Sequence, residues 1–151
     1  MNLNVRELQI FLNLLKYAYL NENLVAIRLL GLIGTCDRAD DDFVFRLMVD
    51  NEKHKILLQE VLHEISYEHD FDISDYEKNV YLLLELWKGE VDRFDIKVLE
   101  KQAYRIYKML LKFTDEKLKP QLEESVYVSI RSKILEILED EERYSRELEN
   151  I

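Results

Sequence analysis

Six polar residues interrupt the otherwise apolar faces of four periodic segments, and their types are those that bind metal ions or transfer protons. They are Glu22, Asn51, His54, Glu100, Glu141 and Tyr144. Carboxylate oxygens and one imidazole nitrogen form a donor set that suits iron, manganese or zinc. A buried carboxylate that has no partner is costly. Because glutamates fall on three separate apolar faces, we expect them to share one partner in the core.

Four long segments carry these residues, and each repeats apolar side chains every three or four positions, which is typical of one face of an α-helix. The first three span residues 5–33, 39–66 and 92–113, and the fourth runs from the break at residues 114–121 to about residue 148. The apolar residues predicted to face the core are Leu8, Phe11, Leu15, Ala18, Val25, Leu29, Leu32, Val44, Leu47, Leu58, Val61, Ile65, Ile96, Ala103, Tyr107, Leu110, Ile130, Ile134, Ile137 and Leu148. Pro120 marks the break, because proline is tolerated only in the first turn of a helix.

A long connection at residues 67–91 separates the second segment from the third. It begins with an acidic stretch and continues into a short apolar segment, residues 76–87, which we expect to form a short extra helix. The other two connections are short turns, at residues 35–40 and 114–121. The sequence therefore predicts a single all-α domain over residues 1–151, built from two helical hairpins and a long crossover.

The positions of the polar residues along the chain predict that they lie at one depth in such a bundle. The midpoint of Glu22 and His54 is residue 38, which lies within the first turn. The midpoint of Glu100 and Glu141 falls between residues 120 and 121, within the other turn. Residues equally distant from a turn face each other across an antiparallel hairpin. Both pairs are therefore expected at one level of the core, as parts of a shared site.

The charge balance and the single cysteine limit the classes of partner. Lys and Arg number 21 and Asp and Glu number 31, which gives a formal net charge of -10. This acidity argues against a nucleic acid or an anionic membrane as partner, because phosphates attract cations. No apolar run approaches the ~20 residues of a membrane span. Cys36 alone permits neither an intramolecular disulfide nor a cysteine-based zinc site, and we expect a cytoplasmic protein.

The arrangement resembles the ligand set of ferritin-like di-iron carboxylate proteins, in which Glu, Glu-x-x-His, Glu and Glu-x-x-His follow one another on four helices. Residues 100–107, Glu-Lys-Gln-Ala-Tyr-Arg-Ile-Tyr, are similar to the Glu-x-x-Ala-x-x-x-Tyr motif in the third helix of rubrerythrin-like proteins. Residues 138–144 and 50–55 are similar to the fourth-helix and second-helix motifs of that group. The resemblance implies an up-down-down-up four-helix bundle with the long crossover between the second and third helices.

The resemblance also implies which residues bind metal, and it shows where this chain departs from the family. The implied ligands are Glu22, His54, Glu100 and Glu141. Asn51 stands where the second-helix motif has Glu, and Tyr144 stands where the fourth has His. On the first helix the apolar face places Glu22 inward, whereas the spacing to the following residues would place Asn23 there. Tyr107 and Asn23 are candidates for residues that contact the ligands.

Without a metal ion, three carboxylates in a core of low dielectric constant would repel one another. We therefore expect at least one of them to be protonated, or to pair with His54 as an imidazolium. We also expect Tyr144 to donate its hydroxyl to Glu100 or Glu141, because this hydrogen bond would stabilise the site in place of a metal bond.

Three functions stay open from the sequence. The first is a ferritin-like protein with an eroded site that binds one iron, manganese or zinc ion, or none, and has weak or lost oxidoreductase activity. The second is an active di-iron peroxidase or oxidase of the rubrerythrin type, and the third is a non-catalytic, acidic helical interaction module. We also expect a homodimer, because ferritin-like bundles commonly dimerise and the apolar segment at residues 80–87 exceeds the needs of one crossover helix.

Overall fold

The computed structural model describes residues 4–32, 38–68, 78, 82 and 95–149. This part of the chain contains four α-helices and no strand, which confirms the all-α prediction. The helices are α1 (Val5–Leu32), α2 (Arg38–Glu68), α4 (Ile96–Phe113) and α5 (Glu124–Glu149). The short helix expected at residues 76–87 lies outside the described residues except for Lys78 and Leu82, which are both helical.

Polar side chains fix where two of the helices begin. Asn4 precedes α1, and its Oδ1 accepts hydrogen bonds from the backbone N–H groups of Arg6 and Glu7 at 3.0 and 3.3 Å. Asp95 precedes α4 in an extended conformation, and its carboxylate accepts from the backbone N–H two residues later at 2.8 Å. Such caps satisfy N–H groups that have no partner inside the helix. The cap at Asp95 explains why the third helix begins later than its periodicity predicts.

The segment predicted to break the chain between the last two helices is itself helical, but it is not α-helical. α4 continues into η2 (Thr114–Leu118), which is a π-helix, and η3 (Lys119–Gln121), which is a 3-10 helix containing Pro120. The proline therefore lies in the first turn of a short helix, where its missing N–H is tolerated. Leu122 is extended, with φ of -111° and ψ of 152°, and this ends the helical path before α5 begins.

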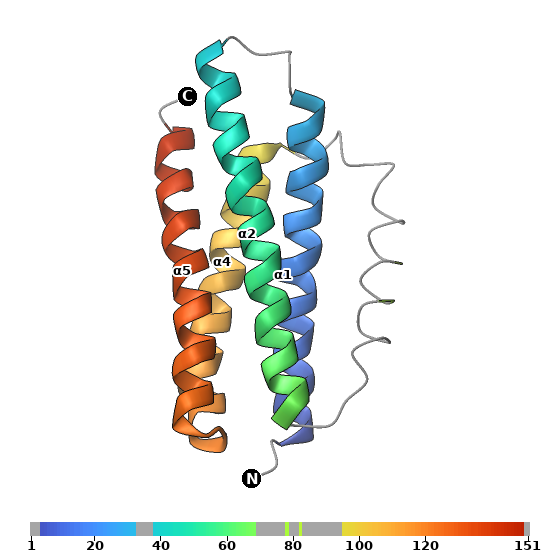
Figure 1. The fold of residues 1–151 in the computed structure, drawn as a ribbon, viewed down its shortest axis with the longest axis vertical. Coiled ribbons are helices and arrows are strands. Elements are labelled where there is room, and N and C mark those ends of the chain that lie inside the picture. Colours follow the sequence, from blue (N-terminus) through green and yellow to red (C-terminus); the bar gives the residue numbers. More distant parts are fainter. Residues whose placement is uncertain (1–3, 33–37, 69–77, 79–81, 83–94, 150–151) are drawn as a thin grey trace.

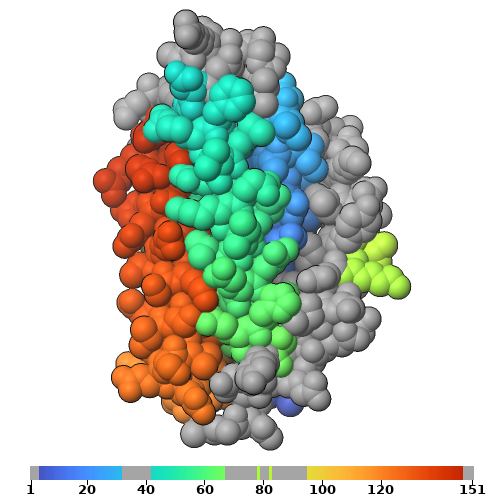
Figure 2. Space-filling view, in the orientation of Figure 1, coloured from blue at the N-terminus to red at the C-terminus, as the bar shows by residue number. Residues whose placement is uncertain are grey.

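The four helices form a bundle in which each helix packs against two neighbours. α1 contacts α2 and α4, and α5 contacts the same two helices. Figure 1 shows that α1 and α2 run in opposite directions, as do α4 and α5, whereas α2 and α4 run in the same direction. The end of α2 and the start of α4 therefore lie at opposite ends of the bundle. In Figure 2 the side chains of α2 and α5 meet along the face that is turned to the viewer.

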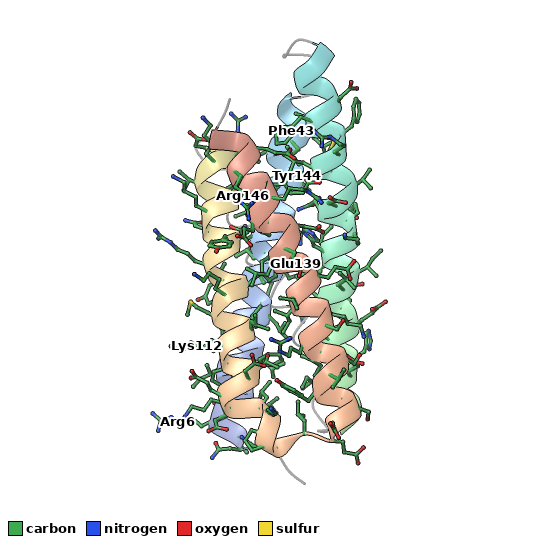
Figure 3. The ribbon with its side chains drawn as sticks, turned by 90° about the vertical axis from the view of Figure 1, so that its left-hand side faces the viewer. Arg6, Phe43, Lys112, Glu139, Tyr144 and Arg146 are labelled. Carbon is green, nitrogen blue, oxygen red and sulfur yellow. The ribbon has the colours of Figure 1, made fainter. Side chains whose placement is uncertain are left out.

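The apolar core is divided into two clusters along the bundle. One includes Phe11 and Ile134, and the other includes Leu29 and Phe43. The apolar residues predicted to face the core are buried or half-buried wherever the side chain is described. Charged side chains such as Lys112 point away from the bundle (Figure 3). On α2, α4 and α5, buried polar residues lie in sequence between the residues of the two apolar clusters, and on α1 Glu22 lies near the boundary between them.

Candidate metal centre

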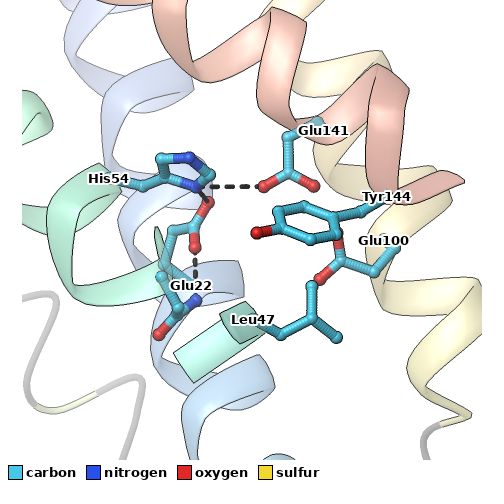
Figure 4. A pocket seen from close by; sticks show the side chains of 7 residues that line it. Glu22, Leu47, His54, Glu100, Glu141 and Tyr144 are labelled. Carbon is cyan, nitrogen blue, oxygen red and sulfur yellow. Dashed lines mark hydrogen bonds and ion pairs between the residues drawn. The ribbon is translucent and has the colours of Figure 1, made fainter. Parts of the chain in front are cut away.

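A small pocket lies inside the bundle, at the level of these polar residues (Figure 4). All four long helices contribute to its wall, and the described side chains leave no space for a water-sized sphere. The lining residues are Glu22, Leu47, Asn51, His54, Glu100, Glu141 and Tyr144. All six polar residues singled out from the sequence therefore line one pocket, and each exposes 3% of its surface or less. The two on α2 and the two on α5 are three positions apart, so each pair shares one helix face.

Two hydrogen bonds hold the carboxylate of Glu22 in the pocket. The hydroxyl of Tyr107 donates to Oε1 at 2.6 Å, and the side-chain amide of Asn51 donates to Oε2. Burial and the negative charge of Glu22 raise the pKa of Tyr107 well above its usual value, so the phenol keeps its proton and donates. Asn23 instead donates to the carbonyl of Tyr19 on its own helix at 2.8 Å. On α1 it is therefore Glu22, and not Asn23, that faces the pocket.

The imidazole of His54 lies between carboxylates on both sides. Its Nδ1 is 3.4 Å from Glu22 Oε1 and 3.2 Å from Glu141 Oε1. Its Nε2 is 2.9 Å from Oδ2 of Asp140, which also accepts from the ammonium of Lys53 at 2.7 Å. A carboxylate only accepts, so Nε2 carries a proton and Nδ1 is the nitrogen that faces the pocket. Asp140 thus fixes which ring nitrogen points toward the glutamates.

The acidic neighbours change the charge of His54. Burial alone would lower the pKa of the imidazole, but the hydrogen bond to Asp140 and the close carboxylates of Glu141 and Glu22 outweigh burial and raise the pKa to about 12. Burial would raise the pKa of Asp140, but hydrogen bonds from His54 and Lys53 lower it to about 2. In the metal-free protein at neutral pH, His54 is therefore an imidazolium paired with an ionised Asp140.

The glutamates of the pocket repel one another. Burial, reinforced by the charge of Glu141, raises the pKa of Glu22 from its ordinary value of 4.5 to about 7. The same two causes raise the pKa of Glu100 well above its usual range. Oε2 of Glu100 and Oε2 of Glu141 are both buried, and neither has a hydrogen-bond partner among the described residues. These directions agree with the expectation that one carboxylate is protonated or pairs with His54.

Tyr144 departs from the expectation drawn from the sequence. Its ring lines the pocket, but its hydroxyl donates to a carboxylate oxygen of Asp50 and lies 3.5 Å from the carbonyl oxygen of Arg46. The prediction that it donates to Glu100 or Glu141 is therefore wrong. The long side chain crosses from α5 to α2, where it also packs edge-on against Phe43 at 6.0 Å between ring centroids (Figure 3).

Three charged residues beside the pocket were not found from the sequence. They are Asp50, Lys53 and Asp140. Asp50 contacts Tyr144, and Asp140 contacts both His54 and Lys53. One signal was available, because a buried histidine needs an acceptor for its second N–H. Asp140 precedes Glu141 and lies four positions before Tyr144, which places it on the side of α5 that faces α2. The helical periodicity alone does not reveal this contact, since it depends on which helix lies opposite.

The donor set fits a divalent cation. One potential ligand atom from each of Glu22, His54 and Glu141 lies within 4.8 Å of the others. Metal–oxygen and metal–nitrogen bonds of ~2.1 Å would place ligands on opposite sides of an ion ~4.2 Å apart, so these atoms need to move little to surround one. Glu100 lines the same pocket and has an unpaired buried oxygen. A cation would also relieve the repulsion between the glutamates.

No family of proteins, no curated protein and no solved structure matches this chain. None of the described helices is both long enough and apolar enough to span a membrane. The geometry and chemistry of the pocket are therefore the features that bear on function.

Proposed function

We propose that this chain is a ferritin-like, rubrerythrin-related four-helix bundle whose di-iron site is eroded to a single metal site, with weak or lost oxidoreductase activity. One observation carries the proposal. Glu22, His54, Glu100 and Glu141 come from four different helices and line one buried pocket. The helix directions fit the up-down-down-up order of that family. Convergence of this donor set from four helices is the arrangement that di-iron bundles use.

Each residue has a defined part in the proposed site. Glu22, His54 and Glu141 would hold the ion, with Glu100 as a third carboxylate in the same pocket. A bound iron ion would supply one-electron redox chemistry, whereas zinc would supply only positive charge. Tyr107 and Asn51 orient the carboxylate of Glu22, and Asp140 orients the imidazole of His54. Such supporting hydrogen bonds usually keep ligands in position.

The two replaced positions favour one ion over two. Asn51 is neutral and donates its amide N–H to Glu22, so it adds no negative charge to the pocket. Tyr144 directs its hydroxyl toward Asp50 and supplies a ring where a second imidazole would stand. Three glutamates therefore remain where a di-iron site balances two ions against about four carboxylates.

Restoring the replaced residues tests the family assignment. The double variant Asn51→Glu/Tyr144→His should bind more iron than the parent, approaching two ions per chain, as measured by metal analysis after anaerobic loading with Fe²⁺. In the metal-free state it should be less stable than the parent, because a fourth carboxylate enters the pocket. A double variant that binds no more iron than the parent would mean that the resemblance at these positions is accidental.

A non-catalytic interaction module is the second candidate, and a surface feature favours it. Phe45, Val49 and Ile56 are each more than half exposed on α2, although apolar side chains of this size are usually buried. The ion pairs of His54 also give the glutamates a partner without any metal. Purified protein that carries no metal, and whose melting temperature is unchanged by added Fe²⁺, Mn²⁺ or Zn²⁺, would favour this function.

A further inference from the structure

We propose that the pocket holds its ion in a closed shell of protein atoms, without a coordination position for water or substrate, so that the ion stabilises the bundle and does not turn over a substrate. The inference rests on the metal site proposed above and assigns a role to it. Metal sites with a structural role are closed by protein ligands, whereas catalytic sites keep one position for water or substrate.

The unpaired atoms of the pocket point to a cation. Glu100 Oε2 and Glu141 Oε2 are buried and make no hydrogen bond within the described part of the chain. They come from two helices and belong to residues that line the same space. Carboxylate oxygens can only accept while they are ionised. Two such oxygens in one space call for a shared partner that carries positive charge, and His54 Nδ1, which faces the same glutamates, can bind that partner once it gives up its proton.

The size of the pocket excludes the usual alternative partner. Buried polar atoms without a protein partner are commonly bridged by an ordered water molecule. Between the described side chains that line this pocket there is no room for a sphere the size of water. A bare divalent ion is smaller than water, and Glu22, His54 and Glu141 can approach it from atoms already within 4.8 Å of one another. The pocket therefore suits an ion that has shed its water.

Tyr144 lies between the pocket and the surface of the bundle. Its ring lines the pocket, where Figure 4 shows it beside Glu141 and Glu100. The same residue also lines an open surface groove, together with Phe45, Val49 and Arg143. Its hydroxyl is anchored on Asp50, which lines the groove as well. Removing the ring would join the two spaces and let water reach the ion.

Mn²⁺ is the probe that tests this inference, because water bound directly to Mn²⁺ strongly increases the relaxation rate of water protons. The full chain is loaded with Mn²⁺, bound ion is counted by electron paramagnetic resonance, and water-proton relaxation is measured on the loaded protein. For the parent we expect bound Mn²⁺ that lacks the relaxation of directly coordinated water. Loading should also raise the melting temperature, and a chelator should reverse this rise.

Three variants keep the test decisive. Tyr144→Ala should bind Mn²⁺ and show the added relaxation of coordinated water, because the ring no longer closes the pocket. Tyr144→Phe is the matched control, since it keeps the ring and should leave the site closed. Leu47→Ala removes another apolar wall of the pocket and serves if Tyr144→Ala does not fold.

The outcomes separate this inference from the proposed metal site. Bound Mn²⁺ that relaxes water in the parent would overturn the closed shell and leave the metal site standing. Bound Mn²⁺ that leaves the melting temperature unchanged would overturn the stabilising role. A parent that binds no Mn²⁺, Fe²⁺ or Zn²⁺ would overturn both.

Discussion

At His54, one ring nitrogen faces two glutamates and the other faces Asp140, so a single side chain connects the pocket to the surface of the bundle. Asp140 in turn contacts Lys53, whose side chain is partly exposed. A buried histidine that is held from behind by a carboxylate presents its free nitrogen in one orientation only. The proposed metal site would therefore depend on Asp140, which does not itself line the pocket.

The first prediction concerns the contact by which Asp140 orients His54. Asp140→Ala should weaken metal binding by about 10- to 100-fold, because the imidazole loses the acceptor that orients it. Binding is measured by competition with a chelator of known affinity. Glu139→Gln is the matched control, since it also removes one negative charge from α5 but at an exposed position (Figure 3). Equal loss of affinity in both variants would show that overall charge, and not orientation, is responsible.

The second prediction is a pH dependence of the metal-free protein. Asp140 has a lowered pKa, so its contribution to stability is present above its unfolded value of 3.8 and is lost as the pH falls toward about 2. Glu22 has a raised pKa, so its contribution is present below 4.5 and is lost as the pH rises toward about 7. His54 has a raised pKa as well, and its contribution declines above 6.5.

The free energy of unfolding should therefore be highest at mildly acidic pH and should fall between pH 5 and 8. Denaturant unfolding in the presence of a chelator, repeated across this range, measures it. Glu22→Gln should flatten the decline, whereas Glu139→Gln, which removes an exposed carboxylate, should change it less. Stability that rises steadily from pH 5 to 8 would contradict the charge assignment.

The six polar residues of the pocket could be predicted from the sequence because each interrupts an apolar helical face. Depth in the bundle followed from the midpoints of the two turns, which requires only antiparallel neighbours. The contacts of Asp50, Lys53 and Asp140 could not be predicted, since they lie at the edges of their faces and depend on the side chains opposite. The direction of the Tyr144 hydroxyl was predicted wrongly for the same reason.

At the scale of elements, some features of the helices could be predicted from the sequence and others could not. Periodicity predicts α1 and α2 to within a few residues, because long amphipathic patterns leave little choice of face. It does not predict the start of α4, which depends on one capping side chain at Asp95, or the π-helical continuation at Thr114–Leu118. Such ends are decided by individual hydrogen bonds, which apolar spacing does not encode.

The third prediction follows from that cap. Asp95→Ala should lower the free energy of unfolding by about 1 kcal/mol, because the first turn of α4 loses a side-chain acceptor. It should also weaken metal binding, since Glu100 lies close behind the cap. Asp95→Asn keeps an acceptor and should behave like the parent in denaturant unfolding. An Asp95→Ala variant of unchanged stability would show that the cap does not limit the helix.

At the scale of the whole molecule, the polar pocket divides the core between two apolar clusters. Burial of ionisable groups in the middle of a bundle is unfavourable unless they are paired, so the layer lowers stability in exchange for a defined site. Apolar packing above and below holds the four helices in register. This arrangement fits a protein whose fold is supported by the clusters and whose function depends on the layer.

The fourth prediction is a homodimer in solution. It comes from the apolar segment at residues 80–87, which lies outside the described residues except for Leu82, and Leu82 is more than half exposed. Light scattering at tens of micromolar should give a mass near twice that of the chain, and replacing apolar residues of this segment with Ser should reduce it. A monomeric mass for the parent would reject this assembly.

The count of bound ions tests the central claim most directly. The parent and the double variant Glu22→Gln/Glu141→Gln are equilibrated with Fe²⁺ without oxygen, separated from free ion, and analysed for metal and protein. We predict one ion per chain in the parent and none in the variant, because two of the three clustered ligands lose their charge. A parent that retains no ion, or a variant that retains as much as the parent, would contradict a metal site in this pocket.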